Sequence, residues 1–156
     1  MEVEDFIAIT DTCKDLYCFQ HVPYIWKTFI LRDFNQDYTG DKAPKRYLKL
    51  LIRDLAGVLT NLSNRYNLRG FAKTYKIVPK PNQAKWDFAL SNLYATQALS
   101  ALGVSISNNY LSLLGYKVGF ELIEGIRLNS NNEIITIATI ITYFKKKKQE
   151  LALLDS

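Results

Sequence analysis

Between Pro44 and about Asn67, apolar side chains recur every three or four residues. These positions are Leu48, Leu51, Leu55, Val58, Leu59 and Leu62. The spacing places them on one face of an α-helix, because an α-helix turns once in about 3.6 residues. Only 7 Gly and 4 Pro interrupt the 156 residues, so long stretches lack helix breakers. With 48% apolar residues to build a core, the sequence predicts an all-α protein.

The same reasoning predicts the order of the elements. We expect short helices over residues 2–19 and 23–34, a polar linker over 35–44, and the long helix from Pro44. Residues 68–82 look irregular or extended. Further helices are expected at about 82–102, ended by Gly103, from Ser107 or Asn108 to about Leu128, and at about 133–152. The last segment is rich in Ile and Thr, so a strand is the alternative there.

These elements predict a helical bundle with about four core helices and an N-terminal helical arm. We assign residues 1–81 to the arm, with a basic segment at 42–81, and residues 82–156 to the core.

Charge is unevenly distributed along the chain, whose net charge is +5. Residues 1–41 carry 8 acidic and 3 basic groups, whereas residues 42–85 carry 11 basic groups and one carboxylate, Asp54. Such polarity is typical of a protein with a polyanionic partner, or of one with an acidic neighbour in an assembly.

The basic block has two interpretations. It is either a solvated helix face, balanced by the acidic N-terminal segment of the same or a neighbouring subunit, or a surface that contacts phosphates. On the second interpretation, binding to nucleic acid is independent of sequence and falls with salt. The candidate DNA-binding residues are Lys42, Lys45, Arg46, Lys49, Arg53, Arg65, Arg69, Lys73, Lys76, Lys80 and Lys85.

Residue patterns typical of catalysis or metal binding are not found. His21 is the only histidine, and a surface or structural role is expected for it. Cys13 and Cys18 are expected to be free thiols in the core. Glu121 and Glu124 fit a solvated helix face, and the run at 145–148 fits a solvated helix end, with phosphate or membrane-surface contact as the minor alternative. We therefore expect no enzyme, no cofactor and no metal.

The N-terminus carries Glu2, Glu4 and Asp5, where a signal peptide would need basic residues. The longest apolar run, at 134–144, is shorter than the roughly 20 residues that span a bilayer. We therefore expect a soluble protein of intracellular origin.

Residues 82–144 contain "ALSALGVSISNNYLSLLGYKVGFELIEGIRLNSNNEIITIATIITYF". This segment resembles the C-terminal helical core of the major capsid proteins of archaeal filamentous and rod-shaped DNA viruses, of the rudivirus and lipothrixvirus type. The likeness includes a helix ending in "ALGVS", a helix bearing "LGYKVGFELI", and an apolar helix ending in Tyr143. Gly103, Gly115 and Gly119 belong to it, and Gly115 and Gly119, one helical turn apart, would let another backbone approach closely.

The resemblance implies a structural role without catalysis. Proteins of that family are helical bundles with an N-terminal helical arm; they pair as dimers that wrap double-stranded DNA in the A form inside a helical filament. The implied partners are duplex DNA and an identical or homologous capsid subunit, with a lipid envelope as a further possibility. The implied location is the virion nucleocapsid, and the host cytoplasm before assembly. The likeness does not extend into 42–85, so the contact residues above rest on charge alone.

A backbone-binding coat also fits the composition, since side chains cannot read bases in the deep, narrow major groove of an A-form helix. One feature departs from the family, because residues 1–41 are acidic. We expect this segment to face away from DNA and to meet a basic surface of a neighbouring subunit, so that deletion of residues 2–36 would spare DNA binding.

A different reading comes from "KDLYCFQHVPYIWK". Asp15, Leu16, Phe19, Val22 and Trp26 match the spacing of an F-box, a helical module that docks an adaptor to a ubiquitin ligase. The leucine-proline start of that module is missing. An F-box-like adaptor, or another non-enzymatic nucleic-acid-binding assembly protein, is therefore the alternative function.

Overall fold

The computed structural model describes residues 1–40, 42–65, 85–115 and 117–155, and at 85–88 and 154–155 it describes the backbone alone. The described residues form helices and no strand, so the all-α prediction is confirmed. The helices are α1 (Val3–Asp11), α2 (Lys14–Tyr17), the 3₁₀ helix η1 (Cys18–His21), α3 (Pro23–Phe34), α4 (Ala43–Arg65), α6 (Lys85–Ala101), α7 (Asn108–Leu113), α8 (Val118–Leu128) and α9 (Glu133–Asp155).

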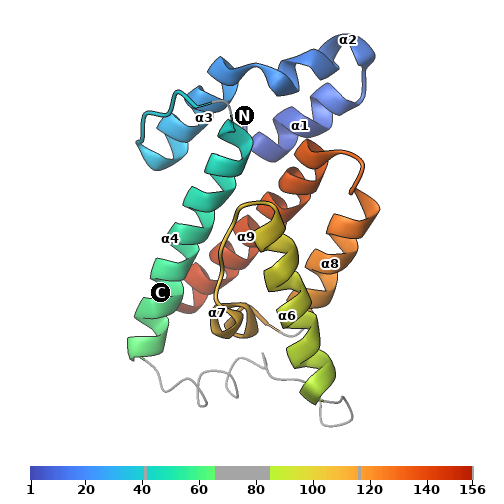
Figure 1. Ribbon diagram of the computed structural model, residues 1–156. Helices are drawn as coiled ribbons and strands as arrows, with labels where there is room; N and C mark the ends of the chain where they lie inside the picture. The colour runs from blue at the N-terminus through green and yellow to red at the C-terminus, as the bar shows by residue number, and fades with distance from the viewer. Residues whose placement is uncertain (41, 66–84, 116, 156) are drawn as a thin grey trace.

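The long helices form the centre of the molecule, where α4 packs against α9 and α6 against α8 (Figure 1). Helices α1 to α3 lie across one end of this bundle, and α1 and α3 contact α9 and α4 respectively. Buried side chains from α1, α3, α4 and α6 to α9 belong to one hydrophobic cluster. In the described residues, the predicted arm and the predicted core are thus parts of one packed body.

Local sequence explains most helix boundaries. Pro23 is the first residue of α3, where its fixed φ is favourable and its missing N–H costs nothing. Gly103 ends α6 with a φ of +79°, and the Val104 N–H donates to the Leu99 carbonyl at 3.0 Å. The Ser107 hydroxyl accepts a bond from the Asn109 N–H and begins α7.

Two expected helices are broken. The helix predicted over 2–19 is interrupted between Asp11 and Lys14, and it continues as α2 and η1. The helix predicted from Ser107 or Asn108 to Leu128 is divided into α7 and α8. The second break contains Gly115, at a φ of 125°, and Lys117, at a φ of 81°. Both angles lie outside the right-handed helical region, so the chain changes direction there.

The segment at 133–152 is helical, which excludes the strand alternative. Before it, the Asn132 side chain accepts a bond from the Ile135 N–H at 3.1 Å, as a helix cap does. Helix α4 ends its described part at Arg65, and residues 68–82 lie outside the described residues, so the irregular segment predicted there stays a prediction.

Candidate nucleic-acid interface

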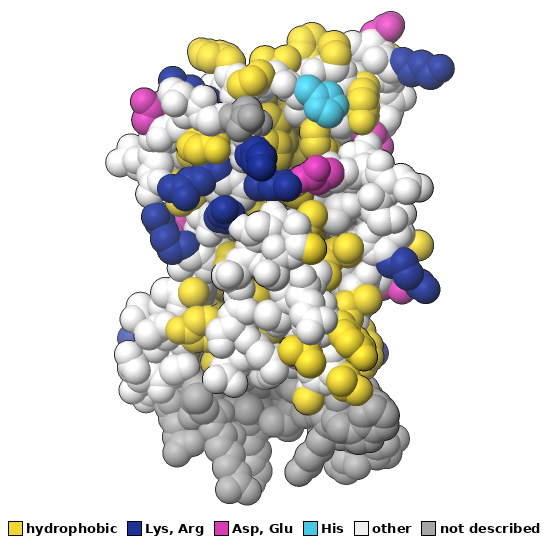
Figure 2. Space-filling view, viewed as in Figure 1, with side chains coloured by type: hydrophobic (Ala, Val, Ile, Leu, Met, Phe, Trp, Pro, Cys, Tyr) yellow, Lys and Arg dark blue, Asp and Glu magenta, His cyan; other side chains and the backbone are white. Residues whose placement is uncertain are grey.

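Five cations of the basic block lie on one side of α4 and just before it. They are Lys42, Lys45, Arg46, Lys49 and Arg53, and we call them the cation row. Their spacing repeats every three or four residues, so they occupy one stripe along the helix. Figure 2 shows Lys and Arg side chains gathered on this face of the molecule, over the upper part of α4. The opposite face of α4 packs into the core, where Leu48, Leu55 and Leu59 are buried.

The members of the row differ in their partners. The Lys45 ammonium group lies 2.8 Å from the Glu133 carboxylate, and the Arg53 guanidinium lies 3.6 Å from Asp54. Arg46 donates to Gln36 at 3.3 Å and lies over the Tyr38 ring. Lys42 and Lys49 are exposed and have no ion-pair partner within the described ranges. Within the described residues, the row is therefore only partly neutralised.

Three members of the row lie where a helix disfavours cations. Helix α4 has no acidic residue in its first turn, and Lys45 and Arg46 lie there, with Lys42 immediately before the helix. A helix N-terminus carries a partial positive charge, which favours anions and disfavours cations by a few tenths of a kcal/mol or more each. This arrangement costs stability in the free protein and favours an external anion.

The other candidate contact residues are less well defined. Arg65 is exposed at the last described position of α4. Lys85 begins α6, where only the backbone is described. The remaining candidates, Arg69, Lys73, Lys76 and Lys80, lie outside the described residues, and their roles stay predictions.

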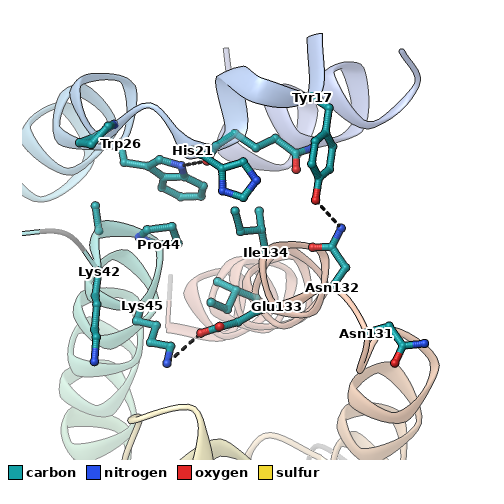
Figure 3. A pocket seen from close by; sticks show the side chains of 14 residues that line it. Tyr17, His21, Trp26, Lys42, Pro44, Lys45, Asn131, Asn132, Glu133 and Ile134 are labelled. Atoms are coloured by element: carbon teal, nitrogen blue, oxygen red, sulfur yellow. Dashed lines mark hydrogen bonds and ion pairs between the residues drawn. The ribbon is translucent and has the colours of Figure 1, made fainter. Parts of the chain in front are cut away.

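Three hollows border the cation row. The first, of about 390 Å³, lies between η1, the start of α4 and the turn before α9 (Figure 3). It is lined by Lys42 and Lys45, and the Lys45–Glu133 ion pair spans it. The second, of about 290 Å³, is lined by Lys45, Glu133 and Ser130. The third, of about 360 Å³, is lined by Lys49, Arg53 and Ser105.

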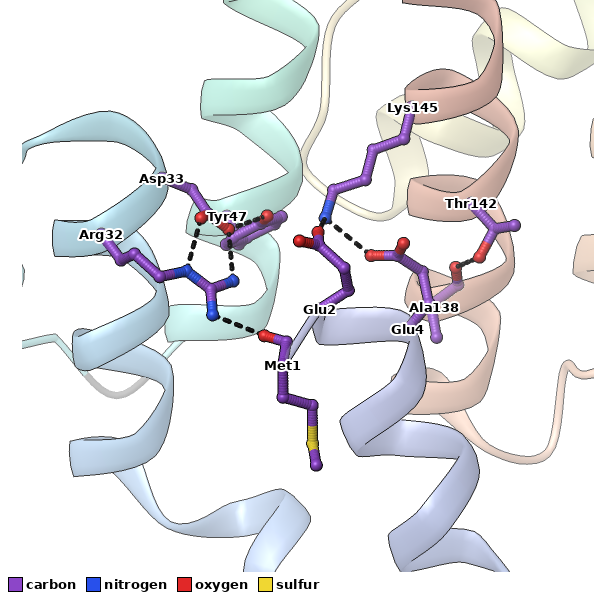
Figure 4. Close-up of polar contacts among 9 residues, drawn as sticks. All are labelled: Met1, Glu2, Glu4, Arg32, Asp33, Tyr47, Ala138, Thr142 and Lys145. Atoms are coloured by element: carbon purple, nitrogen blue, oxygen red, sulfur yellow. Dashed lines mark hydrogen bonds and ion pairs between the residues drawn. The ribbon is translucent and has the colours of Figure 1, made fainter. Parts of the chain in front are cut away.

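A second charged cluster joins the N-terminal segment to α9, and its centre, Lys145, was missed by sequence reasoning. Lys145, from α9, points between Glu2 and Glu4 of the N-terminal segment, at 2.9 and 2.7 Å from their carboxylates (Figure 4). Its ammonium group also lies 5.4 Å from the centre of the Tyr47 ring. The Lys145 side chain is only 18% exposed, so the prediction of a solvated helix end is wrong for this residue.

The other residues discussed in the sequence analysis lie apart from the cation row, with the exception of His21. His21 is exposed, with its ring against Tyr17, and it lines the first hollow. Cys13 and Cys18 are free, as predicted, but both are exposed, so their predicted burial is wrong. Glu124 pairs with Arg127 on the surface of α8.

Among the described residues, no group of three or more His, Cys, Asp or Glu is arranged to hold a metal ion. Within the same residues, no helix combines the length and the apolar character that crossing a membrane requires.

Comparison with known proteins gives no relative, because no family model, no curated protein and no solved structure matches this chain.

Proposed function

We propose that this chain is a structural coat protein that binds double-stranded DNA through its sugar-phosphate backbone, independently of base sequence. The observation that carries the proposal is the cation row, with its exposed Lys42 and Lys49 and with three of its members at a helix N-terminus, where cations are disfavoured. Such a row spans about 16 Å of helix. Over that length, B-form DNA carries roughly nine phosphate charges, more than enough to engage five cations.

The proposal includes the assembly implied by the resemblance. Identical or homologous subunits pair, and the pairs wrap the duplex, held in the A form, into a filamentous nucleocapsid without catalysing a reaction. The all-helical bundle is compatible with this role. A coat of this kind covers every sequence in a genome, so it has to bind backbone and shape rather than bases.

The adaptor alternative is less favoured by the geometry. Of the side chains that match the F-box spacing, Trp26 is 1% exposed and donates its Nε1–H to the Gln20 carbonyl. It packs against Phe6, Phe29 and Tyr47 in its own core, and it is not accessible to a partner.

Salt-dependent binding tests the proposal. Neutralising Lys45, Lys49 and Arg53 together with glutamine should flatten the plot of log affinity against log salt by up to about 0.9 for each lost phosphate contact. The loss should be equal for duplexes of unrelated sequence, because phosphate contacts do not read bases. Fluorescence anisotropy at several salt concentrations measures both quantities.

A charge-matched control removes three cations outside the row, Lys14, Lys27 and Lys146, again by glutamine substitution. It should leave most of the salt dependence intact. If the wild type and the row variant show the same salt dependence, Lys45, Lys49 and Arg53 do not contact DNA. An affinity that depends on base sequence would contradict backbone binding.

A further inference from the structure

The three hollows beside the cation row follow one another along α4. The first two share Lys45 and Glu133 in their walls. Leu102 lines the second hollow, and the next residue in the chain, Gly103, lines the third. Along the groove the cations follow in chain order, from Lys42 at one end to Arg53 at the other. We call this feature the α4 groove.

The two walls of the α4 groove differ in chemistry. One wall is α4, which contributes the cations. The other is formed by η1 in the first hollow, and elsewhere by the loop after α6 and the turn before α9, which contribute the exposed residues Ser105 and Ser130. Among the described residues that line the three hollows, Glu133 is the one carboxylate. The groove thus offers positive charge on one side and uncharged donors on the other.

This pairing suits a single sugar-phosphate strand. Ammonium and guanidinium groups attract phosphates, while serine hydroxyls donate to phosphate or sugar oxygens without adding charge. Four of the five cations, Lys42, Lys45, Lys49 and Arg53, line the hollows. They extend over about 16 Å of helix, so successive phosphates of one strand come within their reach. A flat patch of lysines would attract a phosphate strand without fixing its path. A groove with a second wall restricts the strand to one path beside α4.

We propose that one strand of the bound nucleic acid lies along the α4 groove, with Ser105 and Ser130 as uncharged contacts and Glu133 as a built-in competitor for the phosphate at Lys45. The inference rests on the proposed function and deepens it. In the free protein, Glu133 holds Lys45 at 2.8 Å, and a phosphate that approaches has to displace it (Figure 3). Glu133 then faces the strand as a like charge, which weakens binding.

Glu133→Gln tests the competitor. The substitution removes the like charge and frees Lys45, so affinity for a mixed-sequence duplex should rise about twofold to fivefold, the value of a surface ion pair. Glu124→Gln is the matched control, since Glu124 is also about half exposed and pairs with Arg127 at 2.7 Å on α8. Both variants change the net charge equally, so a difference between them reports position and not total charge.

Ser105→Ala with Ser130→Ala tests the uncharged wall. The double variant should bind the duplex about fivefold to thirtyfold more weakly, because two neutral hydrogen bonds are lost. Its salt slope should stay that of the wild type, since a hydroxyl releases no counterions. Thr12→Ala with Thr28→Ala, which removes two exposed hydroxyls that line none of the three hollows, should have no effect.

The outcomes separate this inference from the proposed function. If Glu133→Gln equals its control, or the serine variant binds like the wild type, the strand does not follow the groove. The slope change of the row variant would then still support backbone binding. A wild-type protein that binds no duplex would overturn both.

Discussion

Lys145 is the first of four consecutive lysines, but its ammonium group lies between Glu2 and Glu4, with Tyr47 beside it. Burial alone would lower the pKa of Lys145, but its hydrogen bonds to Glu4 and Glu2 outweigh burial, and the pKa is raised. Lys145 therefore carries its charge in the folded protein and fastens the N-terminal segment to α9. A lysine run thus contains one residue with a structural role.

Asp33 belongs to the same charged cluster and contacts Tyr47 and Arg32. It accepts hydrogen bonds from the Arg32 guanidinium and from the buried Tyr47 hydroxyl (Figure 4). Burial opposes ionisation of Asp33, but the hydrogen bonds from Arg32 and Tyr47 prevail and lower its pKa. For Tyr47, burial and the bond to Asp33 raise the pKa, so the phenol stays protonated and donates. The pKa of Glu2 is lowered by its hydrogen bond to Lys145.

These lowered pKa values predict an acid-labile fold. A carboxylate whose pKa is lower in the folded state stabilises the protein above its unfolded pKa, about 4, and loses this contribution as pH falls through the folded pKa. The free energy of unfolding should therefore decrease below about pH 4. Urea denaturation between pH 7 and pH 2 measures it.

The double variant Glu2→Gln with Asp33→Asn should be less stable at pH 7 and should lose less stability on acidification than the wild type. Asp11→Asn, at an exposed carboxylate, is the control. An unchanged acid transition in the double variant would show that these two carboxylates do not carry the pH dependence.

At the scale of elements, the contact between α6 and α8 depends on a missing side chain. A Cβ atom at Gly119 would lie 2.6 Å from the Asn92 side-chain oxygen and 3.1 Å from the Asn92 backbone nitrogen. The sequence predicted that Gly115 and Gly119 would admit another backbone. Gly119 does admit α6, while Gly115 lies in the break before α8.

Gly119→Ala should therefore destabilise the protein by about 1–3 kcal/mol, the usual cost of overpacking a core. Gly57→Ala is the contrasting variant, because Gly57 lies inside α4 with nothing within 4 Å of its added Cβ. There alanine should stabilise by up to about 1 kcal/mol, since it favours the helix more than glycine does. Chemical denaturation measures the free energy of unfolding of both variants. Equal changes in the two variants would contradict the close packing of α6 against Gly119.

Helix positions were predictable where the spacing of apolar residues and the residues that begin or end helices agree. The spacing of apolar residues predicted α4, and the helix expected over 23–34 begins at Pro23 as α3 does. Gly103 marked the end of α6. The break inside the expected helix at 107–128 was not predictable, because Lys117 adopts a positive φ that its residue type does not favour. Tertiary packing decides such positions.

Helix α9 shows that local preference can be overridden. Its Ile and Thr residues favour strands. Ile137, Ile140 and Ile141 are buried in the common core, and the Thr139 and Thr142 hydroxyls donate to carbonyls four residues earlier. Burial of one face stabilises the helix. The bonds to carbonyls four residues earlier give the threonine hydroxyls a partner within it.

At the scale of the whole molecule, the acidic N-terminal segment and the basic segment after it are arranged differently in space. Glu2 and Glu4 pair with Lys145 of the same chain, whereas the row on α4 keeps exposed cations. The sequence identified the members of the row through the concentration of basic residues in 42–85. It carried no signal for Glu133 or Lys145, whose partners are far away along the chain. Pairing of the remaining acidic residues with a neighbouring subunit stays a hypothesis.

The common core also changes how the N-terminal segment can be tested. Trp26 and Ile30 of α3 and Val3 of α1 are buried with the residues of α4. Deletion of residues 2–36 removes this part of the core and uncovers Tyr47, whose ring packs against Trp26 and Phe34. Loss of DNA binding after that deletion would report unfolding, and point substitutions are therefore the better test.

The most direct measurement is an NMR titration of the ¹⁵N-labelled 17.9-kDa protein with a short duplex of mixed sequence. We predict that the largest amide shifts fall on residues 42–53, at Ser105 and around Glu133, and that they reverse as salt is raised. An unrelated duplex should shift the same residues. Shifts confined to other surfaces, or no shifts at low salt, would contradict the assignment of the α4 face to DNA.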